Sequence, residues 1–301
     1  MGCLTAIVLG AAAGGGYPQW NCKCPVCALA WAGDRRVKPR TQASIAVSAD
    51  GGQWTLLNAS PDLRAQLQAT SALQPRQGPR DSPIAAVVLT GAEVDQTAGL
   101  LVLRERQAFA LHATAETLAA VAANPMFNVL ASNVVPRRTI GAGASLTLPG
   151  GIEAELFTVP GKVPLYLEGD NPDVARDGEG NVGVELRAGG KCLLYVPGAA
   201  AVTPALAERL GHADVILFDG TLFTDDEMIA TGTGAKTGRR MGHMPVDGEG
   251  GSLAALAAIS ARRIYIHINN TNPILVDGSR ERRKVEAAGW EIAEDGLRVT
   301  L

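Results

Sequence analysis

The stretch from Ile84 to Leu100, IAAVVLTGAEVDQTAGL, decides how the rest of this sequence is interpreted. Its first seven residues are an apolar run that predicts a buried strand, and residues 95–106, DQTAGLLVLRER, predict the helix that follows. Glu93 lies in the connecting loop and Asp95 at the start of this helix. Because active sites in layered α/β folds collect where strands end, this loop is the first candidate for chemistry.

The segments on either side continue this alternation of strands and helices. An opening strand within residues 1–13, a hairpin over residues 42–60 that turns at DGG, and a helix over residues 60–70 precede the run. Further antiparallel hairpins and strand–helix units follow it to the C-terminus. This mixture predicts an α/β fold of two mixed β-sheets packed face to face, with helices on the outer faces.

The composition favours one domain and excludes some partners. The 301 residues are 47% hydrophobic and contain no Ser/Pro-rich linker or charge block, which predicts a single domain over residues 1–301. The net charge of −3, with Lys and Arg scattered among Asp and Glu, provides no basic stripe for nucleic acid. The apolar opening segment lacks the positively charged start of a secretion signal, so we interpret it as a strand. No other segment is long and apolar enough to span a bilayer. We therefore expect a cytoplasmic protein with no membrane partner, in which thiols stay reduced.

Three of the five cysteines fall inside NCKCPVC, residues 21–27. Cys22, Cys24 and Cys27 are too closely spaced for a disulfide framework, whereas three thiolates and a fourth ligand from elsewhere suit a tetrahedral structural zinc. Asn270, or another residue of the HINN turn, is a candidate for that fourth ligand. The alternatives are small thiols without a metal and a redox-active C-x-x-C pair.

Polar side chains follow other apolar runs as well. Asp219 follows DVILF, His243 follows a loop that contains Gly and Arg, and His267 follows RIYI. These three side chains therefore join Glu93 and Asp95, which follow the run of residues 84–90, as candidates for the chemistry.

The remaining cysteines and histidines lie apart from these positions. Cys3 and Cys192 stand alone in predicted strands, so we expect both in the core. His112 and His212 have no nearby carboxylate, and we expect them at the surface or in the core.

Longer runs of unusual residues extend over nearly the whole chain. In order they are AAAGGGYPQWNCKCPVCALAWAGD at 11–34, KPRTQASIAVS at 38–48, LTGAEVDQTAGL at 89–100, VPGKVPLYLE at 159–168, ILFDGT at 216–221, KTGRRMGHMPV at 236–246 and HINNTNP at 267–273. Together they resemble the metallo-β-lactamase superfamily and, more narrowly, the PqqB family of pyrroloquinoline quinone biosynthesis proteins. The resemblance implies a metallo-β-lactamase-like αββα sandwich and a role in pyrroloquinoline quinone biosynthesis.

The sequence departs from that superfamily at the metal-binding positions. Typical hydrolases of this fold carry an H-x-H-x-D-H loop, a third histidine and a bridging aspartate. In the loop only the aspartate is kept, as Asp95, and the other positions hold different residues: Gly91, Glu93 and Gln96 in the loop, Gly161 and Lys162 near the third histidine, and Gly198 near the bridging aspartate. A binuclear hydrolase site cannot be assembled from them. Gln96 stands where a histidine ligand is expected. Either the metal is bound without a ligand from this position, or the affinity of the site for the metal is reduced.

The donors that remain are two imidazoles and one to three carboxylates. This set resembles mononuclear non-haem Fe(II) sites, which leave open positions for dioxygen and substrate, although Zn and Mn accept similar donors. We predict an active-site metal, inferred as Fe(II), held by Asp95, Asp219, His243 and His267, with Glu93 assisting catalysis. The alternatives are a solvated loop pair for Glu93 and Asp95, a turn-forming residue for Asp219 and a core residue for His267.

The family resemblance also implies a reaction. A cross-linked Glu–Tyr unit, cut from a precursor peptide, would be hydroxylated on its tyrosine ring with dioxygen as co-substrate. Four basic residues are suited to pair with the carboxylates of that substrate, or alternatively form a solvated basic loop: Lys162, Lys236, Arg239 and Arg240. Other enzymes of the same biosynthesis are candidate partners. A carrier protein for pyrroloquinoline quinone and a hydrolase of the metallo-β-lactamase fold stay open as alternatives.

Overall fold

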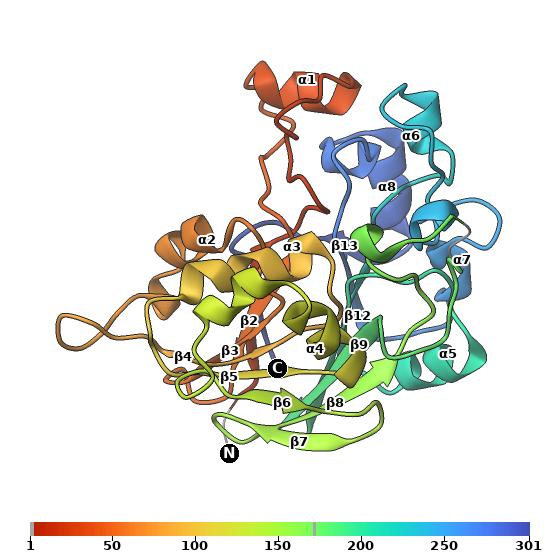
Figure 1. Ribbon diagram of the computed structural model, residues 1–301. Coiled ribbons are helices and arrows are strands. Elements are labelled where there is room, and N and C mark those ends of the chain that lie inside the picture. Colours follow the sequence, from red (N-terminus) through yellow and green to blue (C-terminus); the bar gives the residue numbers. More distant parts are fainter. Residues whose placement is uncertain (1–2, 171–172) are drawn as a thin grey trace.

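Two seven-stranded mixed β-sheets pack face to face in the computed structural model, which describes residues 3–170 and 173–301 (Figure 1). The first sheet has the strand order β14-β1-β2-β3-β4-β5-β6, and the second has the order β13-β12-β11-β10-β9-β8-β7. The strands of the first sheet are β1 (Thr5–Gly10), β2 (Ser44–Ser48), β3 (Trp54–Leu57), β4 (Ile84–Val88), β5 (Ala110–Ala113), β6 (Arg137–Thr139) and β14 (Arg298–Thr300). Those of the second are β7 (Ser145–Leu148), β8 (Ile152–Thr158), β9 (Val182–Ala188), β10 (Lys191–Val196), β11 (Val215–Asp219), β12 (Arg262–Ile266) and β13 (Trp290–Ile292).

Each sheet combines an antiparallel and a parallel part. In the first sheet β1, β2 and β3 pair antiparallel, whereas β3 to β6 run parallel. In the second sheet β7 to β10 pair antiparallel and β10 to β13 run parallel. The parallel strands of a sheet all end at one edge, and that is where the polar loops gather.

The core has three layers because both faces of each sheet are buried. Along β1, Ala6 and Val8 point into the space between the sheets, while Ile7 and Leu9 point to the outer face and pack with Leu63 of a helix. This alternation with a period of two is the geometry of a strand. Burial on both faces explains why so many strands are continuous apolar runs.

Helices cover the two outer faces (Figure 1). Apolar residues of α2 and α4 pack on the first sheet, and those of α5 and α8 on the second. The helices are α1 (Pro25–Trp31), α2 (Leu63–Ala69), α3 (Val94–Thr97), α4 (Ala115–Ala122), α5 (Pro204–Gly211), α6 (Glu227–Ala230), α7 (Ser252–Ala255) and α8 (Arg280–Ala287), with 3₁₀ turns η1 (Ser71–Leu73), η2 (Ala98–Leu103), η3 (Pro125–Val129), η4 (Leu165–Leu167), η5 (Arg239–Met241) and η6 (Pro273–Leu275). Within the described residues, none of the helices has the length and apolar character needed to cross a membrane.

The predicted α/β sandwich is confirmed, with two local corrections. The helix expected over residues 95–106 is α3 followed by η2, because Gly99 packs directly on the chain before α2. A Cβ on Gly99 would lie 2.1 Å from the carbonyl oxygen of Ser60, so this close approach decides the path of the turn. Cys192 is buried as predicted, but the prediction for Cys3 is wrong: it precedes β1 and is exposed.

Candidate active site

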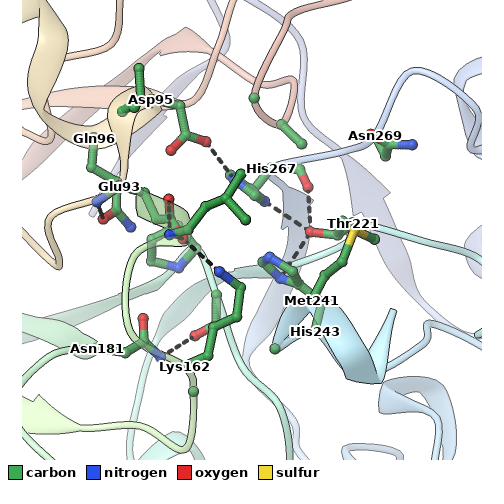
Figure 2. A pocket seen from close by; sticks show the side chains of 18 of the residues that line it. Glu93, Asp95, Gln96, Lys162, Asn181, Thr221, Met241, His243, His267 and Asn269 are labelled. Carbon is green, nitrogen blue, oxygen red and sulfur yellow. Dashed lines mark hydrogen bonds and ion pairs between the residues drawn. The ribbon is translucent and has the colours of Figure 1, made fainter. Parts of the chain in front are cut away.

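The candidate active site lies at the edge where parallel strands of the second sheet end. β11 ends at Asp219 and β12 ends one residue before His267, in a register that places Asp219 opposite Ile266. His243 comes from the loop after η5, and Asp95 comes from α3 on the side of the first sheet. Asp95, His243 and His267 line a cavity of about 610 Å³ (Figure 2). Asp219 is fully buried, with its carboxylate next to His243.

The Asp219 carboxylate is surrounded by donors. Its Oδ2 accepts a hydrogen bond from the Ala199 amide at 2.9 Å and lies 2.6 Å from His243 Nδ1. Its Oδ1 accepts from the amide and the hydroxyl of Thr221, at 3.0 and 2.6 Å. The Thr221 oxygen also lies 3.1 Å from His243 Nδ1 and 2.8 Å from His267 Nδ1. Thr221 therefore joins both imidazoles to Asp219, a role that its place in FDGT did not reveal.

His267 occupies a backbone conformation that favours glycine. Its φ is +58°, in the left-handed region, which non-glycine residues seldom adopt. The amides of Ile268 and Asn269 hold this turn by donating to carbonyls of neighbouring segments, both at 2.9 Å. The turn brings the His267 ring next to the His243 ring, with 5.1 Å between the ring centroids and 20° between the planes. A strained residue held in this way is typical of a functional site.

Asp95 and Thr221 contact opposite sides of the His267 ring (Figure 2). Asp95 Oδ2 lies 3.0 Å from His267 Nε2. Asp95 is in the first turn of α3, where Gln96 Oε1 accepts a hydrogen bond from the Glu93 amide at 3.1 Å in the manner of a capping box. The Gln96 nitrogen donates to Thr90 Oγ1 at 3.3 Å, so both ends of this side chain bind within the loop. Gln96 therefore fixes the turn that presents Asp95.

Opposite charges determine the protonation of this cluster. Burial by itself would raise the pKa of Asp219, but the imidazoles of His243 and His267 outweigh it and hold that pKa below its ordinary value. Burial likewise opposes ionisation of Asp95, and its hydrogen bond and charge interaction with His267 lower its pKa. For His267 burial acts to lower the pKa, while Asp95 and Asp219 raise it above the ordinary value. The site is therefore built to hold positive charge between two carboxylates.

The donor set fits a divalent cation. One ligand atom each from Asp219, His243 and His267 lies within 4.8 Å of the other two. Two imidazoles with one carboxylate suit iron, and also zinc or manganese. Asp95 contributes a second carboxylate next to His267, so the structure brings together the four residues that the sequence predicted as metal ligands.

Amide side chains occupy the space beside the positions where the superfamily carries further metal ligands. A Cβ on Gly91 would lie 2.6 Å from Gln96 Oε1, and a Cβ on Gly161 would lie 2.4 Å from Asn181 Nδ2. A side chain at either position would clash with these amides. Asn181 lines the cavity and has no signal in the sequence, because nothing in its neighbourhood marks it as a site residue.

The basic residues gather on an acidic residue that the sequence did not single out. Lys162 Nζ lies 2.8 Å from Glu93 Oε1 and 2.9 Å from Glu168 Oε1. Arg240 and Lys236 approach Glu168 Oε2 at 3.1 and 3.7 Å. The side chain of Glu168 is 7% exposed, and Lys162, Lys236 and Glu168 all line the cavity.

Two groups of predicted residues lie elsewhere. Arg239 donates to the carbonyl of Glu249 at 2.7 Å and is not part of the cavity lining. His112 is buried in β5, and His212 is exposed at the end of α5. The three side chains therefore make no contact with the cavity in the part of the chain that the structure describes.

The three cysteines of NCKCPVC converge at a second cluster, at the start of α1. The Sγ atoms of Cys22, Cys24 and Cys27 lie within 4.8 Å of one another. Asn270 Nδ2 lies 3.2 Å from Cys22 Sγ and 3.3 Å from Cys27 Sγ, and its backbone oxygen lies 3.7 Å from Cys24 Sγ. Burial raises the pKa of Cys24 to about 12 and raises that of Cys27 as well. These thiols therefore stay neutral unless a cation such as Zn²⁺ draws their protons off.

Comparisons with known proteins agree with this geometry. A family model described as "Beta-lactamase superfamily domain" matches residues 53–268. Coenzyme PQQ synthesis protein B of Methylobacterium nodulans is 56% identical over 299 residues, which cover 99% of this chain and 100% of that protein. The same protein of Rhizobium meliloti is 57% identical, over 99% of this chain and 98% of its own length.

Solved structures show the same relationship. The crystal structure of Zn²⁺-bound PqqB from Methylobacterium extorquens superimposes with a TM-score of 0.97 and 54% identity, over 99% of this chain and 100% of that one. A diphosphatase of the PhnP family superimposes with a TM-score of 0.70 but only 20% identity, over 99% of this chain and 97% of that one, and shares the fold alone.

Proposed function

This chain belongs to the coenzyme PQQ synthesis protein B family, and from that premise we propose that it hydroxylates the tyrosine ring of a cross-linked Glu–Tyr compound with Fe(II) and dioxygen. The observation that carries the proposal is the convergence of Asp219, His243 and His267 on one point beside the cavity. One carboxylate and two imidazoles are the donors of mononuclear iron oxygenases.

Asp219, His243 and His267 would hold the iron, which supplies the one-electron and oxygen chemistry that zinc cannot. The chain's own residues fix these donors. Thr221 donates to Asp219 and contacts both imidazoles, so it sets their orientation relative to the carboxylate. On the other side of that ring Asp95 Oδ2 lies 3.0 Å from His267 Nε2 and would be a further ligand of the iron, which leaves the Thr221 contact as the outer hydrogen bond of His267. Such outer hydrogen bonds fix the tautomer and direction of a ligating histidine.

The substrate would bind through its charged groups. A Glu–Tyr compound carries carboxylates, and Lys162, Lys236 and Arg240 present cationic groups around Glu168. A substrate carboxylate would exchange with Glu93 or Glu168 for one of these partners. The cavity volume of about 610 Å³ is within the ordinary range for small-molecule sites and accommodates two linked amino acids.

A structural zinc at Cys22, Cys24 and Cys27 completes the proposal. The three sulfurs offer the soft donors that zinc prefers, and the backbone oxygen of Asn270, 3.7 Å from the Sγ atoms of Cys24 and Cys27, would complete the shell. The zinc would fix the arm that carries α1 against the turn after His267. It has no part in the oxidation, because zinc does not change its oxidation state.

The test is reconstitution of anaerobically purified protein with Fe(II), a reductant, dioxygen and the cross-linked Glu–Tyr compound. The wild type should consume oxygen in proportion to a product that is one oxygen atom heavier. His243→Ala and His267→Ala should lose both the product and the iron while they keep the zinc, because too few strong donors remain. His212→Ala, which removes an exposed histidine outside the cavity, is the matched control and should behave as the wild type.

An unreduced rate in both active-site variants, or equal activity without iron, would refute the oxygenase proposal in favour of a carrier for pyrroloquinoline quinone. Turnover of phosphodiester, lactam or thioester substrates that His243→Ala abolishes would instead favour a hydrolase. The amides of Gln96 and Asn181 oppose that outcome, because they occupy the space beside two of the positions where a hydrolase of this fold carries metal ligands.

A further inference from the structure

The amide of Asn181 is held in one orientation on the wall of the cavity. Its Nδ2 donates to the carbonyl oxygens of Val159 and Gly198, both at 3.1 Å. Its backbone pairs with Gly91 in an isolated bridge and accepts from the Val159 amide at 3.1 Å. Because both amide hydrogens are directed at backbone carbonyls, the positions of nitrogen and oxygen are fixed by the hydrogen bonds.

The Asn181 oxygen is consequently left without a donor among the described residues, and it lies in the wall of the cavity (Figure 2). It is also next to the metal cluster. A Cβ built on Gly198 would lie 3.6 Å from Asn181 Oδ1 and 3.5 Å from His243 Cε1, so one missing side chain separates the amide from the imidazole. A fixed acceptor without a partner, beside the reactive centre, is the kind of polar group that orients a ligand.

The chemistry of this acceptor selects the donor that it receives. A carboxylate offers only acceptor oxygens and would be repelled by an amide oxygen. An ammonium group would be drawn to the carboxylates of Glu93 and Glu168 before a neutral amide. A phenol hydroxyl is a neutral donor that an amide oxygen binds well.

We propose that Asn181 is a specificity-determining residue, whose Oδ1 accepts a hydrogen bond from the phenol hydroxyl of the substrate and so positions the ring beside His243. This inference rests on the proposed function, since it concerns the tyrosine ring of the same substrate. Lys162, which lines the same cavity, would hold a carboxylate of the ligand, and Asn181 would then distinguish a tyrosine ring from a phenylalanine ring.

The experiment measures binding without turnover. Anaerobic protein without added iron is titrated with the cross-linked Glu–Tyr compound and with its counterpart that has phenylalanine in place of tyrosine. The wild type should bind the phenol compound about five- to tenfold more tightly, the effect of one net hydrogen bond. Asn181→Ala should lose that preference and keep its affinity for the phenylalanine compound. Asn124→Ala is the matched control, because its amide also donates to a backbone carbonyl, that of Ala120 at 2.8 Å, but lies outside the cavity.

Three results would overturn the inference: equal binding of the two compounds by the wild type, an equal loss of affinity for both compounds in Asn181→Ala, or an unchanged preference in that variant. The first needs no variant, so it holds even if Asn181→Ala folds poorly. Hydroxylation by the wild type together with an unchanged preference would refute the role of Asn181 alone. Absence of hydroxylation together with an Asn181-dependent preference would refute the proposed reaction and support phenol recognition.

Discussion

Glu227 should make the stability of this protein depend on pH near neutrality. Its side chain, from α6, is buried with 6% of the residue exposed. Oε2 accepts from the Phe223 amide at 2.7 Å, and Oε1 accepts from the Thr271 hydroxyl at 2.5 Å. Thr271 belongs to the turn after His267, so this carboxyl supports the segment that carries an active-site donor. Burial raises the pKa of Glu227 to about 7, although both of these hydrogen bonds act to lower it.

The direction of the effect follows from the raised pKa. Folded protein binds the Glu227 proton more tightly than the unfolded chain does, so stability is complete below the ordinary pKa of 4.5 and falls as the pH rises to about 7. The difference between these two pKa values corresponds to about 3 kcal/mol of unfolding free energy. Other groups titrate in the same range, so the informative quantity is the difference between wild type and Glu227→Gln, whose side chain does not ionise.

The assay is urea unfolding of both proteins from pH 4 to pH 8, at equal metal content. Glu227→Gln should start close to the wild type at pH 4, because the protonated carboxyl of the wild type, like the amide, offers one carbonyl oxygen and one donor group. It should then gain about 3 kcal/mol relative to the wild type by pH 8. Glu208→Gln, on the exposed face of α5, should keep the wild-type pH profile. Parallel profiles for wild type and Glu227→Gln would refute the reasoning, since they would mean that Glu227 stays charged despite its burial.

Two other predictions concern the cysteine cluster and the basic residues. Cys24→Ser should remove zinc and lower the melting temperature, because two thiolates hold the ion less firmly than three; elemental analysis that finds the same zinc per chain would contradict the cysteine site. Lys162→Met should raise KM for the Glu–Tyr compound about tenfold with little change in kcat, the effect expected when a charge-assisted hydrogen bond to the substrate is lost. Arg239→Met should leave both constants unchanged, because Arg239 contacts the carbonyl of Glu249 outside the cavity, and an equal effect of the two changes would show that only net charge matters.

The fold was largely predictable because its strands are buried on both faces. A run such as residues 84–89 is apolar throughout and needs no knowledge of its neighbours to indicate a strand. The predictions of local structure were wrong where a contact between residues far apart in the sequence determines the conformation. η2 replaces a regular helix because Gly99 approaches the backbone of Ser60, and that contact has no local signal. The prediction for Cys3 failed because periodicity does not show at which residue a terminal strand begins.

The site was predictable where residue type and position coincide. Asp219 and His267 follow apolar runs, so strand ends and donor chemistry both indicate them. Thr221, Glu168 and Asn181 were missed, because a threonine, a glutamate and an asparagine in loops have many roles. Their contacts appear only when the fold brings them to partners, as when Lys236 and Arg240 form ion pairs with Glu168.

The turn over residues 267–272 ties the two candidate metal sites to one piece of backbone. His267 begins it, and three residues later Asn270 reaches the cysteine sulfurs. The Asn272 side chain donates to the Gly220 carbonyl at 2.9 Å, which anchors the same turn to the end of β11 next to Asp219. A shift of Asn270 on loss of zinc would therefore be transmitted to His267, whose left-handed backbone has little freedom of its own. The proposed zinc would then act on the proposed oxidation through the position of His267. Cys24→Ser protein should lose zinc, whereas His267→Ala protein should lose iron and keep zinc, so measuring both metals in each variant separates loss of this scaffold from loss of a ligand.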